Sequence, residues 1–127
     1  MALFLFTDAI MKNKPIKVFN YGKMSRNFTY VDDIVSGTIK VIDANLKYGI
    51  INIGGDREET LMRYIEVLEN NLGKVARKKM MPMQPGDVPA TVADIRKLRR
   101  LGWKPTTRID EGIKNFVEWY KKYYRIK

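Results

Sequence analysis

The chain is 127 residues long and carries a formal net charge of +10, with 45% hydrophobic and 30% charged residues, a size and composition typical of one folded domain that exclude a disordered chain. It contains no cysteine and no histidine, which excludes disulfides, thiolate chemistry and the commonest general base and metal ligand, so we expect no catalysis by this chain alone. The positive charge favours an anionic partner, whether nucleic acid, anionic lipid or a phosphorylated small molecule.

A helix is expected over residues 1–12, where the apolar run does not alternate, and it ends at the turn signal Lys12-Asn-Lys-Pro15. No capping residue precedes it, so we expect the natural chain to continue upstream. The stretch lacks the basic start and the cleavage site of a signal peptide, and no apolar run reaches the ~18 residues of a membrane span. We therefore expect an untargeted, cytoplasmic protein without a membrane partner.

The next segments predict strands and then a helix. Residues 16–19 and 27–31 are β-branched and aromatic and predict two short strands joined by a turn. From Asp32 the apolar spacing becomes helical, and Asp32 or Asp33 is placed to cap the helix. Residues 50–53 predict another strand, closed by Gly54-Gly55.

The second half is mainly helical. Thr60 is placed to cap a helix that stops at Gly73 and whose apolar stripe is Leu61, Ile65, Leu68 and Leu72. Residues 76–83 are compatible with a strand. A short helix over residues 94–101 ends at Gly102, and Thr107 is placed to cap the last helix. The apolar face of that last helix is expected to comprise Ile109, Ile113, Phe116, Val117 and Tyr120. These elements predict an α+β fold, a small mixed α/β unit that forms one domain over residues 1–127.

The first candidate site surrounds Arg26. In a strand, Arg26, Phe28 and Tyr30 share one face, and a guanidinium offers a planar fork that suits phosphate oxygens. As structure alone, however, two such rings are more often core residues than ligand contacts. A second candidate is residues 81–89, where three prolines and one glycine favour an ordered loop and Asp87 offers an acceptor for hydroxyl groups; the same residues are also those of an ordinary turn.

Two further patterns have ordinary structural interpretations. The basic cluster Arg96, Lys97, Arg99 and Arg100 is compatible with nucleic-acid binding, but no aromatic residues interleave with it, which favours a solvated helix face. The aromatic residues 119–124 favour packing over base stacking.

Four stretches, taken together, resemble the C-terminal portion of extended short-chain dehydrogenase/reductases, and most closely the UDP-glucuronate 4-epimerases and related nucleotide-sugar epimerases. They are Met1-Ala-Leu-Phe4, Lys17-Val-Phe-Asn-Tyr-Gly-Lys-Met-Ser-Arg-Asn-Phe-Thr-Tyr-Val-Asp-Asp33, Met81-Pro-Met-Gln-Pro-Gly-Asp-Val-Pro-Ala90, and Leu101-Gly-Trp-Lys-Pro105 with Thr107 running into Glu111-Gly-Ile113 and Phe116 to Tyr120. The resemblance covers essentially the whole chain.

The resemblance implies a UDP-sugar site. In that family Arg26 is similar to the arginine that grips the diphosphate, Phe19 to the ring against uracil, and Asp87 to the acceptor for a ribose hydroxyl. The backbone of Lys17, Val18 and Phe19 is expected to meet the base edge. Gln84 stands where many relatives have a second arginine, which favours the glucuronate branch, and Asn27 replaces the usual aspartate after the arginine. The expected substrate-binding residues are therefore Lys17, Val18, Phe19, Arg26, Phe28, Gln84 and Asp87.

The resemblance also implies that the chemistry lies in another part of the protein. Family members use bound NAD to oxidise the sugar at C4 and return the hydride to its other face, with a catalytic Tyr-x-x-x-Lys in the N-terminal half. Here no strand leads into a Gly-x-Gly-x-x-Gly loop, and Gly54-Gly55-Asp56 lacks the remaining spacing. Tyr123 and Lys127 have the catalytic spacing but lie at the chain end. We therefore expect no cofactor and no catalytic residue in this chain, with NAD bound by the parent enzyme.

Three interpretations follow. In the first, the chain binds a UDP-sugar, and its natural partner is the missing N-terminal Rossmann domain. Without that domain we expect the chain to self-associate through an apolar surface on the first helix and neighbouring strands. In the second, it is a small basic domain that binds nucleic acid or protein, although nucleic acid is not the partner that the pattern favours. The third, a structural remnant without activity, is compatible with the first.

Overall fold

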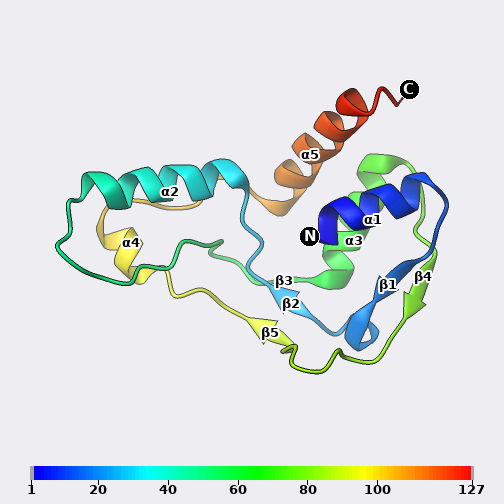
Figure 1. Cartoon of the computed structure of the whole chain (residues 1–127), viewed down its shortest axis with the longest axis horizontal. Coiled ribbons are helices and arrows are strands. Elements are labelled where there is room, and N and C mark those ends of the chain that lie inside the picture. Colours follow the sequence, from blue (N-terminus) through cyan, green and yellow to red (C-terminus); the bar gives the residue numbers. More distant parts are fainter. Residues whose placement is uncertain (1, 127) are drawn as a thin grey trace.

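The computed structural model describes residues 2–126, so that Met1 of the expected first helix and Lys127 of the Tyr-x-x-x-Lys spacing lie outside the described residues. Helices and short strands are mixed along the chain (Figure 1). In order they are α1 (Ala2–Met11), β1 (Ile16–Val18), the 3-10 turn η1 (Phe19–Gly22), β2 (Ser25–Arg26), α2 (Val31–Asp43), β3 (Glu59–Thr60), α3 (Leu61–Leu72), β4 (Lys78–Met80), β5 (Ala90–Thr91), α4 (Arg96–Arg100) and α5 (Ile109–Tyr123). None of the helices within residues 2–126 has the length and apolar character that crossing a membrane requires.

The strands form two small sheets. β1 pairs with β4 in parallel, with Ile16 opposite Lys78, and β2 lies between β3, which is antiparallel to it, and β5, which is parallel. The first two strands were expected to be neighbours joined by a turn, and that expectation was wrong. Asn20, Tyr21 and Gly22 all have positive φ, and the chain leaves this left-handed turn towards a different sheet.

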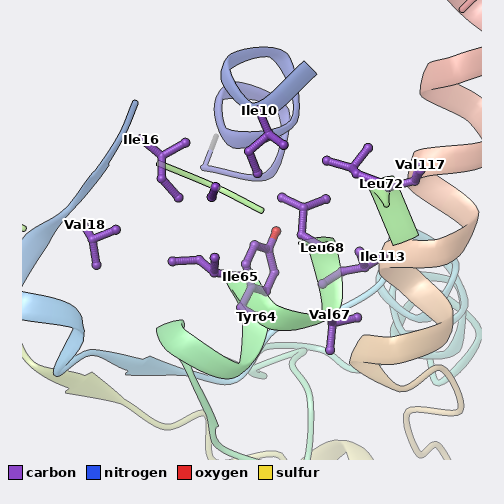
Figure 2. Close-up of a cluster of buried hydrophobic side chains, with 11 residues drawn as sticks. Ile10, Ile16, Val18, Tyr64, Ile65, Val67, Leu68, Leu72, Ile113 and Val117 are labelled. Atoms are coloured by element: carbon purple, nitrogen blue, oxygen red, sulfur yellow. The ribbon is translucent and has the colours of Figure 1, made fainter. Parts of the chain in front are cut away.

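The main hydrophobic core lies between α1, α3, α5 and the β1–β4 pair (Figure 2). Ile65 and Leu68 on α3 are fully buried, as is Val18 on β1. Ile113 and Val117 cover the core from α5, so the apolar stripes that helical spacing predicts for the third and the last helix are confirmed.

A second, smaller cluster holds α2 against α4. Ile95, Leu98 and Trp103 are its buried members, and in Figure 1 α2 and α4 lie at the opposite end of the molecule from α1 and α3. Gly37 allows this contact, because a Cβ there would lie 3.3 Å from Leu98 on α4 and 3.2 Å from the Trp103 ring. α2 therefore approaches α4 more closely than a larger residue at position 37 permits.

Two expected strands are absent from their predicted places. Residues 27–30 follow the two-residue β2 as irregular chain, and residues 50–53 belong to no strand of the described structure. Both segments have the composition of strands, but a strand also needs a neighbour to pair with. Residues 78–80 alone form the strand that residues 76–83 were expected to contain.

The structure confirms the caps expected for α3 but not those expected for α2 and α5. Thr60 accepts a hydrogen bond from the amide of Arg63, and Gly73 ends α3 with a φ of 66°, as the sequence predicts. α2 begins after Tyr30 without a side-chain cap, so the prediction that an aspartate caps it was wrong. α5 begins after Arg108, which makes no side-chain cap, so Thr107 does not cap it either.

Candidate functional site

Arg26 stands where β2 faces the loop that precedes β5. Its Nη2 lies 2.9 Å from Asp87 Oδ1 and 2.9 Å from the carbonyl oxygen of Val88, while Nη1 donates to the carbonyl oxygens of Ser25 and Pro89. Sixty-one positions separate Arg26 from Asp87, so the two residues that were predicted from separate motifs meet in one place. Both side chains are partly exposed, which leaves this ion pair accessible to a ligand.

The loop that carries Asp87 is a tight turn. The Asp87 amide donates to the Gln84 carbonyl, and Asp87 Oδ1 also accepts from the amide of Val88. Gly86 has a φ of +81°, the left-handed conformation that glycine adopts without strain. Gln84 is exposed on the same turn, so its side-chain amide and the Asp87 carboxylate belong to one ordered loop, as the prolines predicted.

The end of β1 is fastened to the start of the same loop. The Met81 amide donates to the Val18 carbonyl, and the Tyr21 amide donates to the Met81 carbonyl, at 2.9 and 3.0 Å. Val18 is fully buried whereas Lys17 is exposed, and Phe19 is half-buried at the start of η1. Because these hydrogen bonds join the segment after β1 to the residues that lead into Gln84 and Asp87, the predicted base and diphosphate contacts lie on connected loops.

The strained turn η1 has a packing reason at its last residue. Gly22 has a φ of +79°, and a Cβ on it would lie 2.7 Å from Met62 Sδ at the start of α3. Only glycine meets both conditions without rearrangement. Asn20 steadies the turn by donating from Nδ2 to the Lys23 carbonyl at 2.7 Å.

Asn27, which replaces the aspartate of the family pattern, is firmly held. Its Oδ1 accepts from the Ala93 amide, and its Nδ2 donates to the Arg57 carbonyl, at 2.9 and 2.8 Å. An aspartate would lose the second of these bonds because a carboxylate has no hydrogen to donate. Asn27 therefore joins the end of β2 to Arg57 on one side and to Ala93 on the other. The guanidinium of Arg26 is held by its own contacts to the protein.

Phe28 does not share an open face with Arg26, as a continuous strand would require. Its ring stacks on Tyr64 at 4.2 Å between centroids and packs against the main core. It also lines an apolar cavity of about 410 Å³ between the start of α1, residues 28–31, α3 and α5. Burial raises the pKa of the Tyr64 phenol.

Asp33 is a buried polar group whose role the sequence did not reveal. It is 3% exposed, and its carboxylate accepts from the amide and hydroxyl of Thr106 and from the amide of Thr107, each at 2.9 Å. Burial alone would raise the pKa of Asp33, but these hydrogen bonds together outweigh it and hold the pKa below its usual value. The carboxylate therefore ties α2 to the segment that leads into α5.

A second link missed by sequence reasoning is Asp56. Its two oxygens bind Arg99 and Arg108, at 3.0 and 2.6 Å, so one carboxylate joins α4 to the residue before α5. On α4, Arg96 also pairs with Asp94. Two of the four basic residues in the cluster that was considered for nucleic acid thus have carboxylate partners within the chain.

Comparison with known proteins identifies the family. Residues 1–54 match the NAD dependent epimerase/dehydratase family. A UDP-glucuronate 4-epimerase of Thermodesulfobacterium geofontis is 41% identical, over 96% of this chain and 38% of that protein, and an uncharacterized protein of Methanocaldococcus jannaschii is 45% identical, over 94% of this chain and 37% of that protein. The crystal structure of the UDP-glucuronic acid 4-epimerase from Bacillus cereus, in complex with UDP-glucuronic acid and NAD, matches with a TM-score of 0.86 and 32% identity, over 98% of this chain and 40% of the other.

The chain thus spans well under half the length of these relatives. Within that span its sequence and its fold follow theirs almost from one end to the other. On this evidence the chain belongs to the NAD dependent epimerase/dehydratase family.

Proposed function

We propose that this chain is the C-terminal, UDP-sugar-binding portion of a nucleotide-sugar 4-epimerase that acts on UDP-glucuronate, and that it is not catalytic by itself. The observation that carries the proposal is the meeting of Arg26 with Asp87, beside a loop that is bonded to the end of β1. A cation for the diphosphate, an acceptor for a ribose hydroxyl and a ring for the base then stand on adjoining loops. The Bacillus cereus relative, solved with UDP-glucuronic acid, supports this choice of ligand.

In this proposal Arg26 exchanges partners when the ligand binds. The guanidinium now donates to three carbonyl oxygens and one carboxylate. A diphosphate carries more negative charge than a single carboxylate and forms strong charge-assisted hydrogen bonds with a guanidinium. When Asp87 is displaced from Arg26, the carboxylate oxygens of Asp87 become free to accept hydrogen bonds from the ribose hydroxyls. The exposed Gln84 offers an uncharged amide donor on the same turn.

NAD and the proton-transfer groups are assigned to the rest of the protein. The double glycine after residues 50–53 does not form an open phosphate cradle, because a Cβ on Gly54 would lie 2.7 Å from Ala93 and one on Gly55 would lie 2.5 Å from the Phe28 carbonyl oxygen. Instead, the two glycines allow this segment to pack closely against Ala93 and against the backbone of Phe28. Gly54 and Gly55 therefore do not form a dinucleotide cradle, and the proposal gives this chain a binding role only.

Calorimetric titration with UDP and with UMP tests the proposal. We expect UDP to bind with a Kd on the order of 1 mM, because only part of a pocket is present. Arg26→Lys removes the fork that holds two phosphate oxygens and should weaken UDP binding roughly tenfold and UMP binding less. Arg100→Lys, a change on exposed α4, is the matched control and should leave both unchanged.

A short DNA duplex, titrated into the same variants, tests the alternative of a nucleic-acid-binding domain. The proposed function would be contradicted if the chain binds DNA through Arg100 and does not bind UDP. It would also be contradicted if the chain binds DNA through Arg100 and Arg26→Lys leaves UDP binding unchanged. Binding of UDP that depends on Arg26 alone would exclude the alternative as the explanation of the basic charge.

A further inference from the structure

The turn η1 holds a backbone conformation that has a cost in free energy. Asn20 and Tyr21 have φ values of 48° and 51°, in the left-handed region that residues with a Cβ seldom adopt. The Tyr21 amide fastens the turn to the loop after β4 by donating to the Met81 carbonyl at 3.0 Å. Because the turn is strained, its position depends on the side chains that pack against it.

The side chain of Met62 packs against the last residue of this turn. A Cβ on Gly22 would lie 2.7 Å from Met62 Sδ and 3.0 Å from its Cγ, so the thioether fills the space that a side chain on Gly22 would need. Met62 is the second residue of α3, whose start is fixed by the Thr60 cap. The thioether therefore lies between a firmly held helix and the turn that begins with Phe19.

The same thioether is accessible to oxidants. Met62 is 37% exposed, whereas Met24, which follows the turn along the chain, is 8% exposed. Since the chain has no cysteine, its sulfur chemistry is that of methionine, which a peroxide converts to the sulfoxide. That reaction turns a flexible apolar side chain into a polar one.

We propose that Met62 is a redox-sensitive positioning residue for η1: its thioether holds the turn in place, and oxidation to the sulfoxide releases the turn and weakens nucleotide binding. The sulfur attacks one oxygen of hydrogen peroxide and the O–O bond breaks. The proton of the transferred oxygen passes to the departing hydroxide, which leaves as water. Sulfur loses two electrons and the peroxide gains two. This inference rests on the proposed function, because it takes Phe19 at the start of η1 to meet the base.

The sulfoxide loosens the contact in either orientation of its oxygen. An oxygen that points inward needs space that the turn occupies, since even a Cβ on Gly22 would lie too close to the sulfur. An oxygen that points to water draws the side chain off the turn, because a polar group loses hydration when it packs against the protein without a hydrogen-bond partner. In both cases the packing that positions Phe19 is lost.

Hydrogen exchange measures the release of the turn without any ligand. The chain is treated with hydrogen peroxide until peptide mass spectrometry shows full conversion of Met62. The Tyr21 amide should then exchange at least about tenfold faster, and reduction by methionine sulfoxide reductases A and B should reverse the change. The Ile16 amide, bonded to the Arg77 carbonyl at 2.8 Å, should exchange at the same rate before and after oxidation.

Calorimetry with UDP measures the effect on binding, with each variant compared with itself before and after peroxide. Oxidation should weaken UDP binding to the wild-type chain roughly threefold, because the turn is no longer ordered before the ligand binds. Met62→Leu keeps an apolar side chain of similar volume but has no sulfur, so its UDP affinity should not respond to peroxide. Met80→Leu is the matched control: Met80 is 45% exposed on β4, and this variant should still lose affinity because Met62 is still oxidised.

The inference would be overturned by Tyr21 exchange that does not change when Met62 is oxidised. A loss of UDP affinity that Met62→Leu does not prevent would also overturn it, because another methionine would then be responsible. Failure of the unoxidised chain to bind UDP would refute the proposed function instead; faster Tyr21 exchange that depends on Met62 would still support the hold of Met62 on the turn.

Discussion

Arg26 and Asp87 hold each other at 2.9 Å before any ligand is present, so the carboxylate competes with a diphosphate for the guanidinium. Asp87→Ala removes that competitor and also the acceptor proposed for the ribose. We expect inorganic pyrophosphate to bind roughly threefold more tightly to this variant, because a partly exposed ion pair is worth under about 1 kcal/mol, and we expect UDP to bind more weakly. Calorimetry with both ligands checks this. Pyrophosphate and UDP affinities that change in the same direction would show that Asp87 has only one of the two roles.

The hydrogen bonds of the buried Asp33 carboxylate predict the effect of replacing it on the stability of the fold. Asp33→Asn turns an acceptor of three hydrogen bonds into a group that presents N–H to donors, and we expect a loss of about 2 kcal/mol in the free energy of unfolding at pH 7. Asp32→Asn, at the exposed neighbouring position, should cost under about 1 kcal/mol through the helix dipole alone.

The pH dependence of the same variant follows from the lowered pKa of Asp33. A group whose pKa is lower in the folded state stabilises the fold above its unfolded pKa of about 3.9 and loses that contribution as the pH falls through the folded value. Urea unfolding should therefore show a difference between wild type and Asp33→Asn that is constant from pH 7 to about 5 and shrinks as the pH falls below the unfolded pKa of about 3.9. A difference that stays constant with pH would show that the charge of Asp33 does not matter.

At the scale of elements, the turn η1 is the most constrained connection in the candidate site. Gly22→Ala must adopt positive φ and also displace Met62, which lies 2.7 Å from the new Cβ. Gly73→Ala is a matched control, because Gly73 also has positive φ but nothing lies within 4 Å of its Cβ. We expect Gly73→Ala to cost about 1 kcal/mol, from the backbone alone, and Gly22→Ala to cost more. Thermal unfolding of both variants, and of Gly22→Ala combined with Met62→Ala, measures the crowding; equal losses in the two single variants would contradict it.

Elements that depend on local rules could be predicted from the sequence. The cap at Thr60, the stop at Gly73 and the buried stripe of α3 each follow from neighbours within a few residues. Residues 50–53 could not be placed correctly, since composition records a preference for strand while pairing depends on a distant or separate partner. Asp33 was predicted as a cap for the same reason: its partners Thr106 and Thr107 lie more than seventy positions away.

The geometry of the candidate site was predicted in part, because the family motifs name the residues that are expected to bind but not how they meet. Arg26 and Asp87 come together as expected. Phe28 was expected beside Arg26 on a strand, and it stacks on Tyr64 instead because β2 ends at Arg26. Asp56, which bridges Arg99 and Arg108, carried no signal beyond its place after two glycines.

As a whole molecule, the chain is two hydrophobic clusters joined by polar links. The larger cluster lies around α3, the smaller one between α2 and α4, and the carboxylates of Asp33 and Asp56 connect the smaller cluster to the start of α5. The candidate site lies on β2 and the loops around it.

The most direct test of the central claim is an NMR titration of the isotope-labelled 127-residue chain with UDP. The claim predicts that the resonances of Phe19, Arg26 and Asp87 shift together with one binding constant, while those of Arg96 to Arg100 stay in place. Shifts confined to Arg96 to Arg100, or no shift at Arg26 when UDP is in large excess, would contradict it.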